Sequence, residues 1–250
     1  MNSNSFNNYN IINVYNKKSI KSGLVTQILY GEKFKIISKY RNWYKIKLHT
    51  DNYVGFIIKK KFAHTFKPTH KISGLKSIIY RHPKNFTKYN SKKFLPFASK
   101  IQILKKHKNF IMFDNQKWLN VKDISPINKK EKNFIKILNL FKNCKYKWGG
   151  KTYNGIDCSA LIQLFYKFNN KFFPRDTVDQ IKYKKGFAKK KKFKLGDIIY
   201  WKGHVAICIN SKELIHAYGP RKKVIIMQIN KTIKLIKKTA NLEIKKIFSI

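Results

Sequence analysis

The sequence predicts an α+β protein in which two small β-rich units precede a domain of helices and antiparallel strands. Short strand-like segments separated by turn residues fill the chain as far as Pro126, helical periodicity follows, and a strand meander begins after Leu195. The 250 residues are enough for one large domain or for two to three small ones. Because 43% of the residues are hydrophobic and 15% aromatic, the chain is not a disordered basic tail.

The first β-rich unit runs from Ile11 to about Phe62. Turn-forming residues lie between its segments at Tyr30-Gly-Glu32 and Thr50-Asp-Asn52. Its strand-like segments cover residues 23–29, 34–37, 43–48 and 53–58. Four or five strands in about 50 residues is the size of a small barrel, so we expect a first barrel domain over residues 1–63.

The second β-rich unit runs from His70 to Pro126 and has the same size. Lys67-Pro68-Thr69 is the expected link between the two units. Strand-like segments cover residues 77–80, 100–104, 109–113 and 117–121. We therefore expect a second barrel domain over residues 64–128.

The remaining residues, 129–250, form the expected third domain. Helices are expected over 131–142 and 159–168, and strands over 198–201, 204–209 and 214–217. The expected apolar faces of the helices are Phe134, Ile135, Leu138 and Phe141 in the first and Leu161, Leu164, Phe165 and Phe168 in the second. Helices followed by an antiparallel run of strands indicate an α+β domain.

The chain is strongly basic, with 56 Lys and Arg against 11 Asp and Glu and a formal net charge of +45. The basic residues are lysines except for Arg41, Arg81, Arg175 and Arg221. Abundant Lys, Asn, Ile, Phe and Tyr all have AT-rich codons, so much of the excess reflects genome composition. Because arginine is better suited to phosphates and base edges, we expect non-specific attraction to polyanions at low salt and no specific nucleic-acid partner.

Membrane and export signals are lacking in the printed sequence. No run approaches 18 consecutive apolar residues, so no membrane-spanning helix is expected. Residues 1–10 have neither the basic nor the apolar region of a secretory signal. The expected location is the cytoplasm, although export by another route is not excluded.

Three cysteines, Cys144, Cys158 and Cys208, form neither a disulfide framework nor a zinc signature, because their number is odd and no C-x-x-C pair occurs. We expect no metal or other cofactor. Cys158 is the candidate nucleophile, since a Gly-containing loop ends at Asp157 and a helix begins at about Cys158. The helix dipole and free N–H groups there favour a thiolate of lowered pKa and stabilise an oxyanion. The alternatives are a small buried cysteine and a helix cap at Asp157.

Two histidines, His204 and His216, lie twelve residues apart on consecutive expected strands. A hairpin loop at 209–211 would pair Cys208 with Lys212 and His204 with His216. Residues an even number apart share a face of a strand, so both rings are expected on one face. One ring is then able to take the thiol proton while the other orients it. The alternative for either histidine alone is an ordinary strand residue.

Six blocks of residues occur in order along the C-terminal half of the chain: Tyr146-Lys-Trp-Gly-Gly, Gly155-Ile-Asp-Cys-Ser-Ala, Pro174-Arg-Asp-Thr with Gln180, Gly196-Asp-Ile-Ile-Tyr-Trp, Gly203-His-Val-Ala-Ile and Leu214-Ile-His-Ala. In order and spacing they resemble the NlpC-type papain-fold cysteine peptidases, which cut peptidoglycan stem peptides. The resemblance covers about residues 130–250 and implies a papain-like catalytic domain of helices plus an antiparallel sheet. The chain departs from the family at Ala160, where glycine is usual, and the added methyl group is expected to leave the nucleophile in place.

The N-terminal half resembles the pair of bacterial SH3-like domains in the dipeptidyl-peptidase VI-like branch of that family. The matching features are Thr26 to Glu32, Trp43, Asp51 to Phe56 and Pro68 to Ser73. The resemblance implies cleavage of the γ-D-glutamyl bond to the diamino acid of murein peptides, often with a free N-terminal L-Ala. Whether the substrate is a recycled peptide or the intact wall stays open, although the lack of a signal favours recycling.

The resemblance also implies roles for individual residues. Cys158 is the expected nucleophile, His204 the general base and acid, and His216 the orienting residue, while Tyr146 helps hold the oxyanion. The expected substrate-binding residues are Asp157, Ser159 and Asp176. Apart from the resemblance, a peptide amine needs a carboxylate in a chain that has only 11 Asp and Glu, so Glu32 is a candidate to bind it. Asp176 alternatively pairs with Arg175 or a lysine, and Tyr146 alternatively is an ordinary loop tyrosine.

We expect a monomeric cysteine endopeptidase acting on a murein peptide. Two alternative functions remain at this point. One is a non-catalytic cell-wall or peptide-binding protein, and the other is an acyltransferase or amidase on the same fold, because the acyl-enzyme chemistry is shared.

Overall fold

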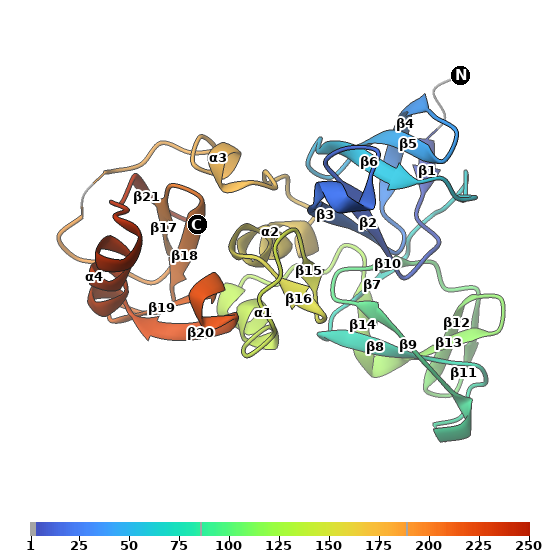
Figure 1. Cartoon of the computed structure of the whole chain (residues 1–250). Coiled ribbons are helices and arrows are strands. Elements are labelled where there is room, and N and C mark those ends of the chain that lie inside the picture. The colour runs from blue at the N-terminus through green and yellow to red at the C-terminus, as the bar shows by residue number, and fades with distance from the viewer. Residues whose placement is uncertain (1–3, 86, 189) are drawn as a thin grey trace. The chain divides into compact units, whose positions relative to one another are not determined.

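The computed structural model describes residues 4–85, 87–188 and 190–250 (Figure 1). The chain divides into two compact units, one formed by Met1–Glu131 with Lys167–Lys171 and the other by Lys132–Tyr166 with Phe172–Ile250. The first unit contains both expected β domains, and the boundary between them at residue 63 stays a prediction. Residues 1–3 of the first expected domain lie outside the described residues.

The first sheet of the first unit has six antiparallel strands in the order β1-β4-β5-β6-β2-β3. The strands are β1 (Asn4–Phe6), β2 (Ile11–Tyr15), β3 (Leu24–Leu29), β4 (Lys33–Lys39), β5 (Trp43–Leu48) and β6 (Val54–Ile58). Alternate residues such as Ile46 and Leu48 face a common core, as a half-buried strand requires. The outer strands β1 and β3 are not paired with each other, so this sheet is open and the expected closed barrel is not observed.

The rest of the first unit has a three-stranded sheet, β10-β7-β14, and a five-stranded sheet, β11-β12-β13-β8-β9. The strands are β7 (His70–Ile72), β8 (Lys76–Tyr80), β9 (Asn90–Pro96), β10 (Lys100–Ile101), β11 (Lys105–His107), β12 (Phe110–Asp114), β13 (Lys117–Asn120) and β14 (Ile124–Pro126). Neither sheet closes. The expected strand over 100–104 is divided, because residues 102–104 carry the chain from one sheet to the other.

Residues 167–171 belong to the first unit because buried cations hold them there. Lys71 is 1% exposed, and its ammonium donates hydrogen bonds to the backbone oxygens of Phe168, Ile127 (3.1 Å) and Lys129 (2.6 Å). Burial, with smaller contributions from nearby lysines, lowers the pKa of Lys71 to about 8. The three carbonyl oxygens supply the hydrogen bonds that a buried ammonium requires.

The second unit is built on a five-stranded antiparallel sheet in the order β20-β19-β18-β17-β21. Its strands are β17 (Asp197–Trp201), β18 (His204–Cys208), β19 (Glu213–Tyr218), β20 (Lys223–Gln228) and β21 (Lys246–Ser249), with a small hairpin of β15 (Lys151–Thr152) and β16 (Gly155–Ile156). Its helices are α1 (Phe134–Leu140), α2 (Cys158–Phe168), α3 (Thr177–Gln180) and α4 (Ile229–Ala240). The second unit therefore combines helices with an antiparallel sheet, as predicted.

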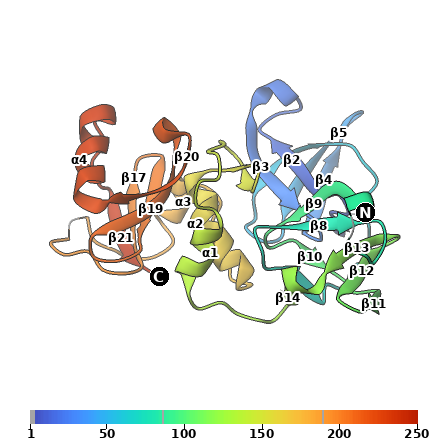
Figure 2. The same ribbon diagram turned by 90° about the horizontal axis from the view of Figure 1, so that it is seen from below.

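Helix α4 packs on one face of this sheet (Figure 2). Its buried residues Ile229 and Ile236 share a core with sheet residues that include Trp201, Cys208 and Leu214. Its exposed side carries lysines, which gives the helix the amphipathic character of a surface element. The sequence prediction did not include this helix or strand β21.

The two predicted helices differ in detail from expectation. In α1 the buried residues are Phe134, Ile137 and Leu138, followed by Phe141, whereas Ile135 is only half-buried. The spacing i, i+3, i+4, i+7 follows the helical repeat more closely than the predicted face did. Every residue of α2 is buried, so this helix has no solvent-facing side.

The hairpin between β18 and β19 has a register two residues away from the predicted one. Cys208 pairs with Leu214, not Lys212, and Ile207 pairs with Ile215. The loop is set by Asn210, whose side-chain oxygen accepts hydrogen bonds of 2.7 Å from the backbone N–H groups of Lys212 and Glu213. A shift of two residues leaves every side chain on its predicted face, whereas a shift of one would have reversed them all.

Among the described residues, no helix is long and apolar enough to cross a membrane.

Candidate active site

Cys158 lies at the start of α2, where the preceding residue Asp157 caps the helix. The Asp157 carboxylate accepts a hydrogen bond of 2.8 Å from the backbone N–H of Ala160, and its carbonyl oxygen accepts one from Leu161. The sulfur of Cys158 is within hydrogen-bonding range of the backbone N–H of Val205, the residue that follows His204. The thiol therefore lies against the strand that carries the first predicted histidine.

The thiol of Cys158 is less acidic than the sequence predicted. Cys158 is 5% exposed, and burial raises the pKa of its thiol to about 12, with a further increase from the Asp157 charge. Hydrogen bonds from Val205 and the helix start oppose this effect without reversing it. The prediction of a free thiolate was therefore wrong, because it considered the helix terminus and not the loss of water around the sulfur.

The two histidines lie on the same face of neighbouring strands and are in direct contact. Nε2 of His204 is 2.9 Å from Nδ1 of His216, and Nε2 of His216 is 3.3 Å from the sulfur of Met227. Tyr218 stacks on the ring of His216 with centroids 4.6 Å apart and an angle of 10°. The orientation of His216 is thus held by contacts on two sides.

These contacts determine which ring nitrogen is available for the thiol. Since His216 occupies Nε2 of His204, only Nδ1 of His204 is free to accept a proton. The consistent arrangement has Nε2–H of His204 donating to Nδ1 of His216, and Nε2–H of His216 directed at the sulfur of Met227. His204 is then a base at Nδ1 and remains a donor to His216 after it is protonated.

Both histidines are neutral over the ordinary pH range. Burial lowers the pKa of His204 to about 4, and burial together with the charge of His204 lowers the pKa of His216 to about 3. With Cys158 protonated as well, the resting site holds a neutral thiol and a neutral imidazole.

Tyr146 lies in the loop before the β15–β16 hairpin, where its backbone N–H donates to the carbonyl of Lys222 at 2.8 Å. Its pKa is raised first by burial and then by the neighbouring charges of Cys158 and Asp157. Tyr146 is therefore protonated at neutral pH, so its hydroxyl is able to act as a hydrogen-bond donor.

Asp157 and Ser159 are occupied by a buried network. Arg175 is 2% exposed and binds both oxygens of Asp157, at 3.0 and 2.6 Å, and the hydroxyl of Ser159 at 2.8 Å. Asp157 also accepts a hydrogen bond of 2.9 Å from the backbone N–H of Gly149. The network joins the loop before Cys158 to the start of α2, so these side chains hold the nucleophile in place.

Asp176 is half-buried at the N-terminus of α3. Arg175 forms an ion pair with Asp157, and the alternative pairing of Asp176 with Arg175 or a lysine stays a prediction. Nearby, the side-chain amide of Gln180 donates to the carbonyls of Ser159 (3.0 Å) and Pro174 (2.9 Å). Gln180 thereby ties α3 to the first turn of α2.

Glu32 lies in the first unit and is fully buried. Its carboxylate accepts hydrogen bonds from the backbone N–H of Leu29 (2.5 Å) and the hydroxyl of Thr50 (3.4 Å), and it forms an ion pair with Lys167. A peptide amine would have to compete with the Lys167 ammonium for this carboxylate. The binding of an amine by Glu32 stays a prediction.

A cavity of about 490 Å³ opens beside the histidine pair. Tyr146, His204 and Tyr218 form the part of its wall nearest the site, and Lys202 and Arg221 flank it. The rest of the lining includes residues of α4 and the segment after it: Leu235, Ile236, Thr239, Ala240 and Leu242. Apart from Tyr146 and His204, these cavity residues were not predicted from the sequence, because the lining comes from four separate segments of the chain.

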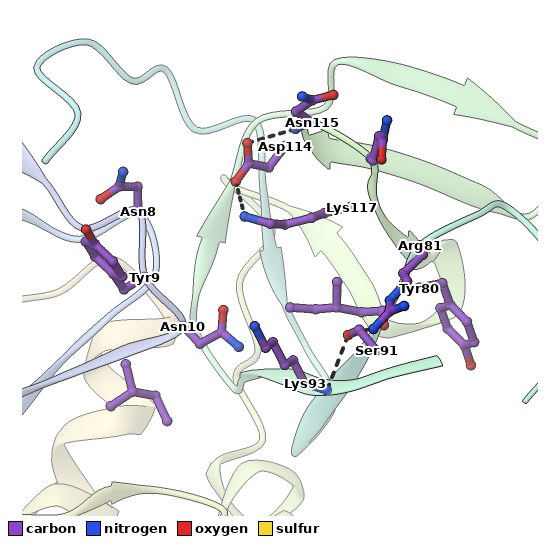
Figure 3. Close-up of a pocket in the computed structure, with 13 residues that line it drawn as sticks. Asn8, Tyr9, Asn10, Tyr80, Arg81, Ser91, Lys93, Asp114, Asn115 and Lys117 are labelled. Atoms are coloured by element: carbon purple, nitrogen blue, oxygen red, sulfur yellow. Dashed lines mark hydrogen bonds and ion pairs between the residues drawn. The ribbon is translucent and has the colours of Figure 1, made fainter. Parts of the chain in front are cut away.

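A larger cavity, about 760 Å³, lies in the first unit (Figure 3). Its polar side chains include Arg81, Lys93 and Lys117, and Lys117 is bound to Asp114 at 2.7 Å. None of the predicted site residues lines this cavity. It is therefore not part of the candidate active site.

The described residues contain no group of three or more His, Cys, Asp or Glu side chains that could hold a metal ion. None of the three cysteines forms a disulfide bond in the described part of the chain. Sequence analysis considered Arg175 only as a partner of Asp176 and assigned no site role to Gln180. Both residues belong to the Pro174 to Gln180 segment that the sequence analysis quoted. Because the chain has only four arginines, the presence of one at position 175 could have indicated a specific role.

A cysteine at the start of a buried helix, against a strand that carries one of two contacting histidines, is the kind of arrangement that cysteine peptidases use. Residues 143–240 match the NlpC/P60 family, and residues 14–61 match the bacterial dipeptidyl-peptidase SH3 domain. The chain therefore carries an NlpC/P60 cysteine peptidase domain preceded by a bacterial dipeptidyl-peptidase SH3 domain.

Two curated relatives match part of the chain. Dipeptidyl-peptidase 6 of Lysinibacillus sphaericus is 34% identical over 76 residues, which are 29% of this chain and 27% of the relative. Gamma-D-glutamyl-L-lysine dipeptidyl-peptidase of Bacillus subtilis (strain 168) is 31% identical over 101 residues, which are 37% of this chain and 34% of the relative. The matches thus span about a third of the relatives' length or less.

The same fold occurs in the crystal structure of an NlpC/P60 family protein from Bacillus cereus ATCC 10987. The two structures have a TM-score of 0.74 and 21% sequence identity, and the match covers 91% of this chain and 95% of the other. At this identity the likeness establishes the fold.

Because His204 is neutral over the ordinary pH range, we expect catalysis to persist to unusually low pH. Protonated His204 is unable to accept the thiol proton, and its pKa is about 4 instead of the ordinary 6.5. We expect kcat/KM to be level across neutral pH and to fall only as the pH approaches about 4. An acid limb near the ordinary histidine value would contradict the buried, neutral state of His204.

Unfolding has to be measured at each pH as a control. Half-buried His204 and buried His216 bind protons less readily in the folded than in the unfolded chain, so folding stability is highest above the unfolded pKa and declines as the pH falls below about 6.5. Circular dichroism before and after each assay will separate this loss from titration of the site.

Proposed function

We propose that this protein is a cysteine peptidase that hydrolyses the γ-D-glutamyl–diamino acid bond of peptidoglycan stem peptides, in the recycling of cell-wall peptides. The NlpC/P60 match and the names of the two curated relatives support this substrate class. The observation that carries the proposal is the contact of 2.9 Å between His204 and His216 next to the strand residue that faces the Cys158 sulfur.

The acylation step follows from the neutral state of the site. As the sulfur of Cys158 attacks the γ-carbonyl carbon, Nδ1 of His204 takes the thiol proton, so a buried thiolate never has to form in advance. The hydroxyl of Tyr146 and backbone N–H groups at the start of α2 stabilise the oxyanion. His204 then donates its proton to the leaving amine, the C–N bond breaks, and a thioester remains on Cys158.

Deacylation uses the same groups in reverse. Neutral His204 accepts a proton from water as the water oxygen attacks the thioester carbonyl. Collapse of the second tetrahedral intermediate releases the γ-glutamyl carboxylate, and His204 returns the proton to the sulfur. His216, whose low pKa keeps it neutral, accepts the Nε2–H hydrogen bond of His204 throughout the cycle.

The finer assignments form part of the proposal. Asp157 and Ser159 act by positioning Cys158 through Arg175, and Asp176, half-buried at the N-terminus of α3, contributes to the substrate pocket. Both β-rich parts of the first unit serve as SH3-like modules. The protein acts as a monomer in the cytoplasm.

Mass spectrometry of L-Ala-γ-D-Glu-diaminopimelate incubated with the protein tests the proposal. The expected products are L-Ala-γ-D-Glu and free diaminopimelate, both absent with Cys158→Ala. Binding of the peptide without cleavage would indicate a non-catalytic wall-binding protein. Transfer of the dipeptide to an added amine in preference to water would indicate an acyltransferase.

The orienting role of His216 predicts a graded response to substitution. We expect His216→Ala to lower kcat by roughly 10²–10⁴-fold, the range of general acid–base catalysis, because His204 loses the acceptor that fixes its ring. His216→Asn places an amide near the position of Nδ1 and should recover part of the loss. Equal kcat for the two variants, at matched stability, would assign His216 a packing role only.

A further inference from the structure

The cavity of the first unit is built from four separate segments of the chain (Figure 3). Its wall consists of residues 8–11, residues 79–81, Ser91 with Lys93, and residues 114–117. At about 760 Å³ it has the size of cavities that bind small molecules. It shares no lining residue with the candidate active site, so a ligand bound here would be independent of the proposed peptidase.

Two cations of this cavity have no acidic partner. Among the described residues that line it, Asp114 alone is acidic, and its carboxylate accepts hydrogen bonds from Lys117 at 2.7 Å and from the backbone N–H of Asn115 at 2.8 Å. Arg81 and Lys93 line the same cavity and form no ion pair with a described residue. The two remaining positive charges favour an anion of charge close to −2, which a phosphate monoester has at neutral pH.

Strand β9 is distorted where it lines the cavity. Residues 91–93 lie opposite a single residue of β8, Ile79, so this part of the strand is a bulge. Lys92 has a φ of 57°, which a lysine rarely adopts. The hydroxyl of Ser91 donates to the carbonyl of Ile79 at 2.6 Å and accepts from the backbone N–H of Lys93 at 3.3 Å, which stabilises the bulge. Bulges redirect side chains and are frequent beside functional sites, so the distortion accounts for the place of Lys93 in the wall.

The cavity also has four side-chain amides that are free to bind a ligand. They belong to Asn8, Asn10, Asn115 and Gln116, and none of them forms a hydrogen bond with a described residue. A side-chain amide both donates and accepts hydrogen bonds, as a hydroxyl group does. These amides therefore suit a ligand with several hydroxyl groups.

We propose that this cavity binds a sugar phosphate. The phosphate lies between the guanidinium of Arg81, which is able to donate two parallel hydrogen bonds, and the ammonium of Lys93. The sugar hydroxyls exchange hydrogen bonds with the side-chain amides, Asn10 and Asn115 among them. A neutral sugar lacks the attraction to the two cations and a bare phosphate ion lacks the amide contacts, so the complete ligand binds more tightly than either part.

Calorimetric titration of the full chain with glucose 6-phosphate, glucose and inorganic phosphate tests the proposal. At about 0.15 M salt, non-specific attraction to this basic protein is largely screened. We expect glucose 6-phosphate to bind at least roughly tenfold more tightly than either glucose or phosphate, the effect of one charge-assisted hydrogen bond. Arg81→Gln and Lys93→Gln should each weaken its binding by roughly tenfold. Both side chains are exposed, so we expect both variants to fold.

Two further variants locate the ligand. Arg41→Gln removes an exposed arginine of the same unit that does not line the cavity, and it should leave the affinity unchanged. Asn115→Ala should weaken the binding of glucose 6-phosphate and not that of inorganic phosphate. Equal affinity for glucose 6-phosphate and inorganic phosphate, an equal effect of Arg41→Gln and Arg81→Gln, or no binding at millimolar ligand would overturn the proposal.

Discussion

Cys158→Ala is expected to abolish turnover, with a loss in kcat on the order of 10⁶-fold, as when a triad enzyme loses its nucleophile. No second side chain in the described site is able to replace the sulfur as nucleophile. His204 and His216 are hydrogen-bonded to each other, and the Tyr146 hydroxyl stays protonated. Single-turnover and steady-state assays on the diaminopimelate tripeptide will measure the loss.

Cys144→Ala is the matched control for that experiment. Cys144 precedes Cys158 in the sequence, forms no disulfide bond and is only half-buried. Its removal should leave kcat within a few-fold of the wild type. Retained activity in Cys158→Ala, or an equal loss in Cys144→Ala, would remove Cys158 from the role of nucleophile.

Arg175→Met is expected to produce the largest loss of stability. The ion pair with Asp157 is buried on both sides, with side-chain exposures of 1% and 6%, so the substitution leaves a carboxylate without its cation. Breaking one side of a buried pair costs about 3–5 kcal/mol in the free energy of unfolding. Urea denaturation followed by circular dichroism will measure the change.

Two further variants test the cause. Lys182→Met breaks the exposed Lys182–Asp179 pair, which spans 4.0 Å with side-chain exposures of 73% and 60%, and should change the free energy of unfolding by about 1 kcal/mol or less. Adding Asp157→Asn to Arg175→Met should recover part of the stability, since the remaining charge is removed. If the double variant is no more stable than Arg175→Met, the cost comes from packing and not from the unpaired charge.

Many elements of the second unit could be predicted from the sequence, because each depends on residues within its own segment of the chain. Helix α2 and strands β17 to β19 follow from apolar periodicity and turn residues, and these elements carry Cys158, His204 and His216. Even spacing along antiparallel strands was enough to place both histidines on one face. The hairpin register was missed by two residues because it depends on hydrogen bonds of the Asn210 side chain.

Strand β9 and the division of the expected strand at 100–104 were not predictable in the same way. Strand β9 contains Lys92 and Lys93 and ends at Pro96, and such residues are unusual in a strand. Its pairing with β8 therefore could not be predicted from its own residues. Its place is decided by its partner strand and not by its own pattern. The closure of a sheet is likewise a property of all its strands together, which is why open sheets occur where closed barrels were expected.

By itself the sequence determined the order of the elements and which residue types meet at the site: a helix-borne thiol and two histidines on one face. Only the tertiary structure decided the charge state of that site and the shape of its cavity. Burial raises the pKa of Cys158 and lowers that of His204, and both shifts depend on how much water the packed neighbours exclude. Exclusion of water is set by segments distant in the chain, so no local pattern of residues encodes it.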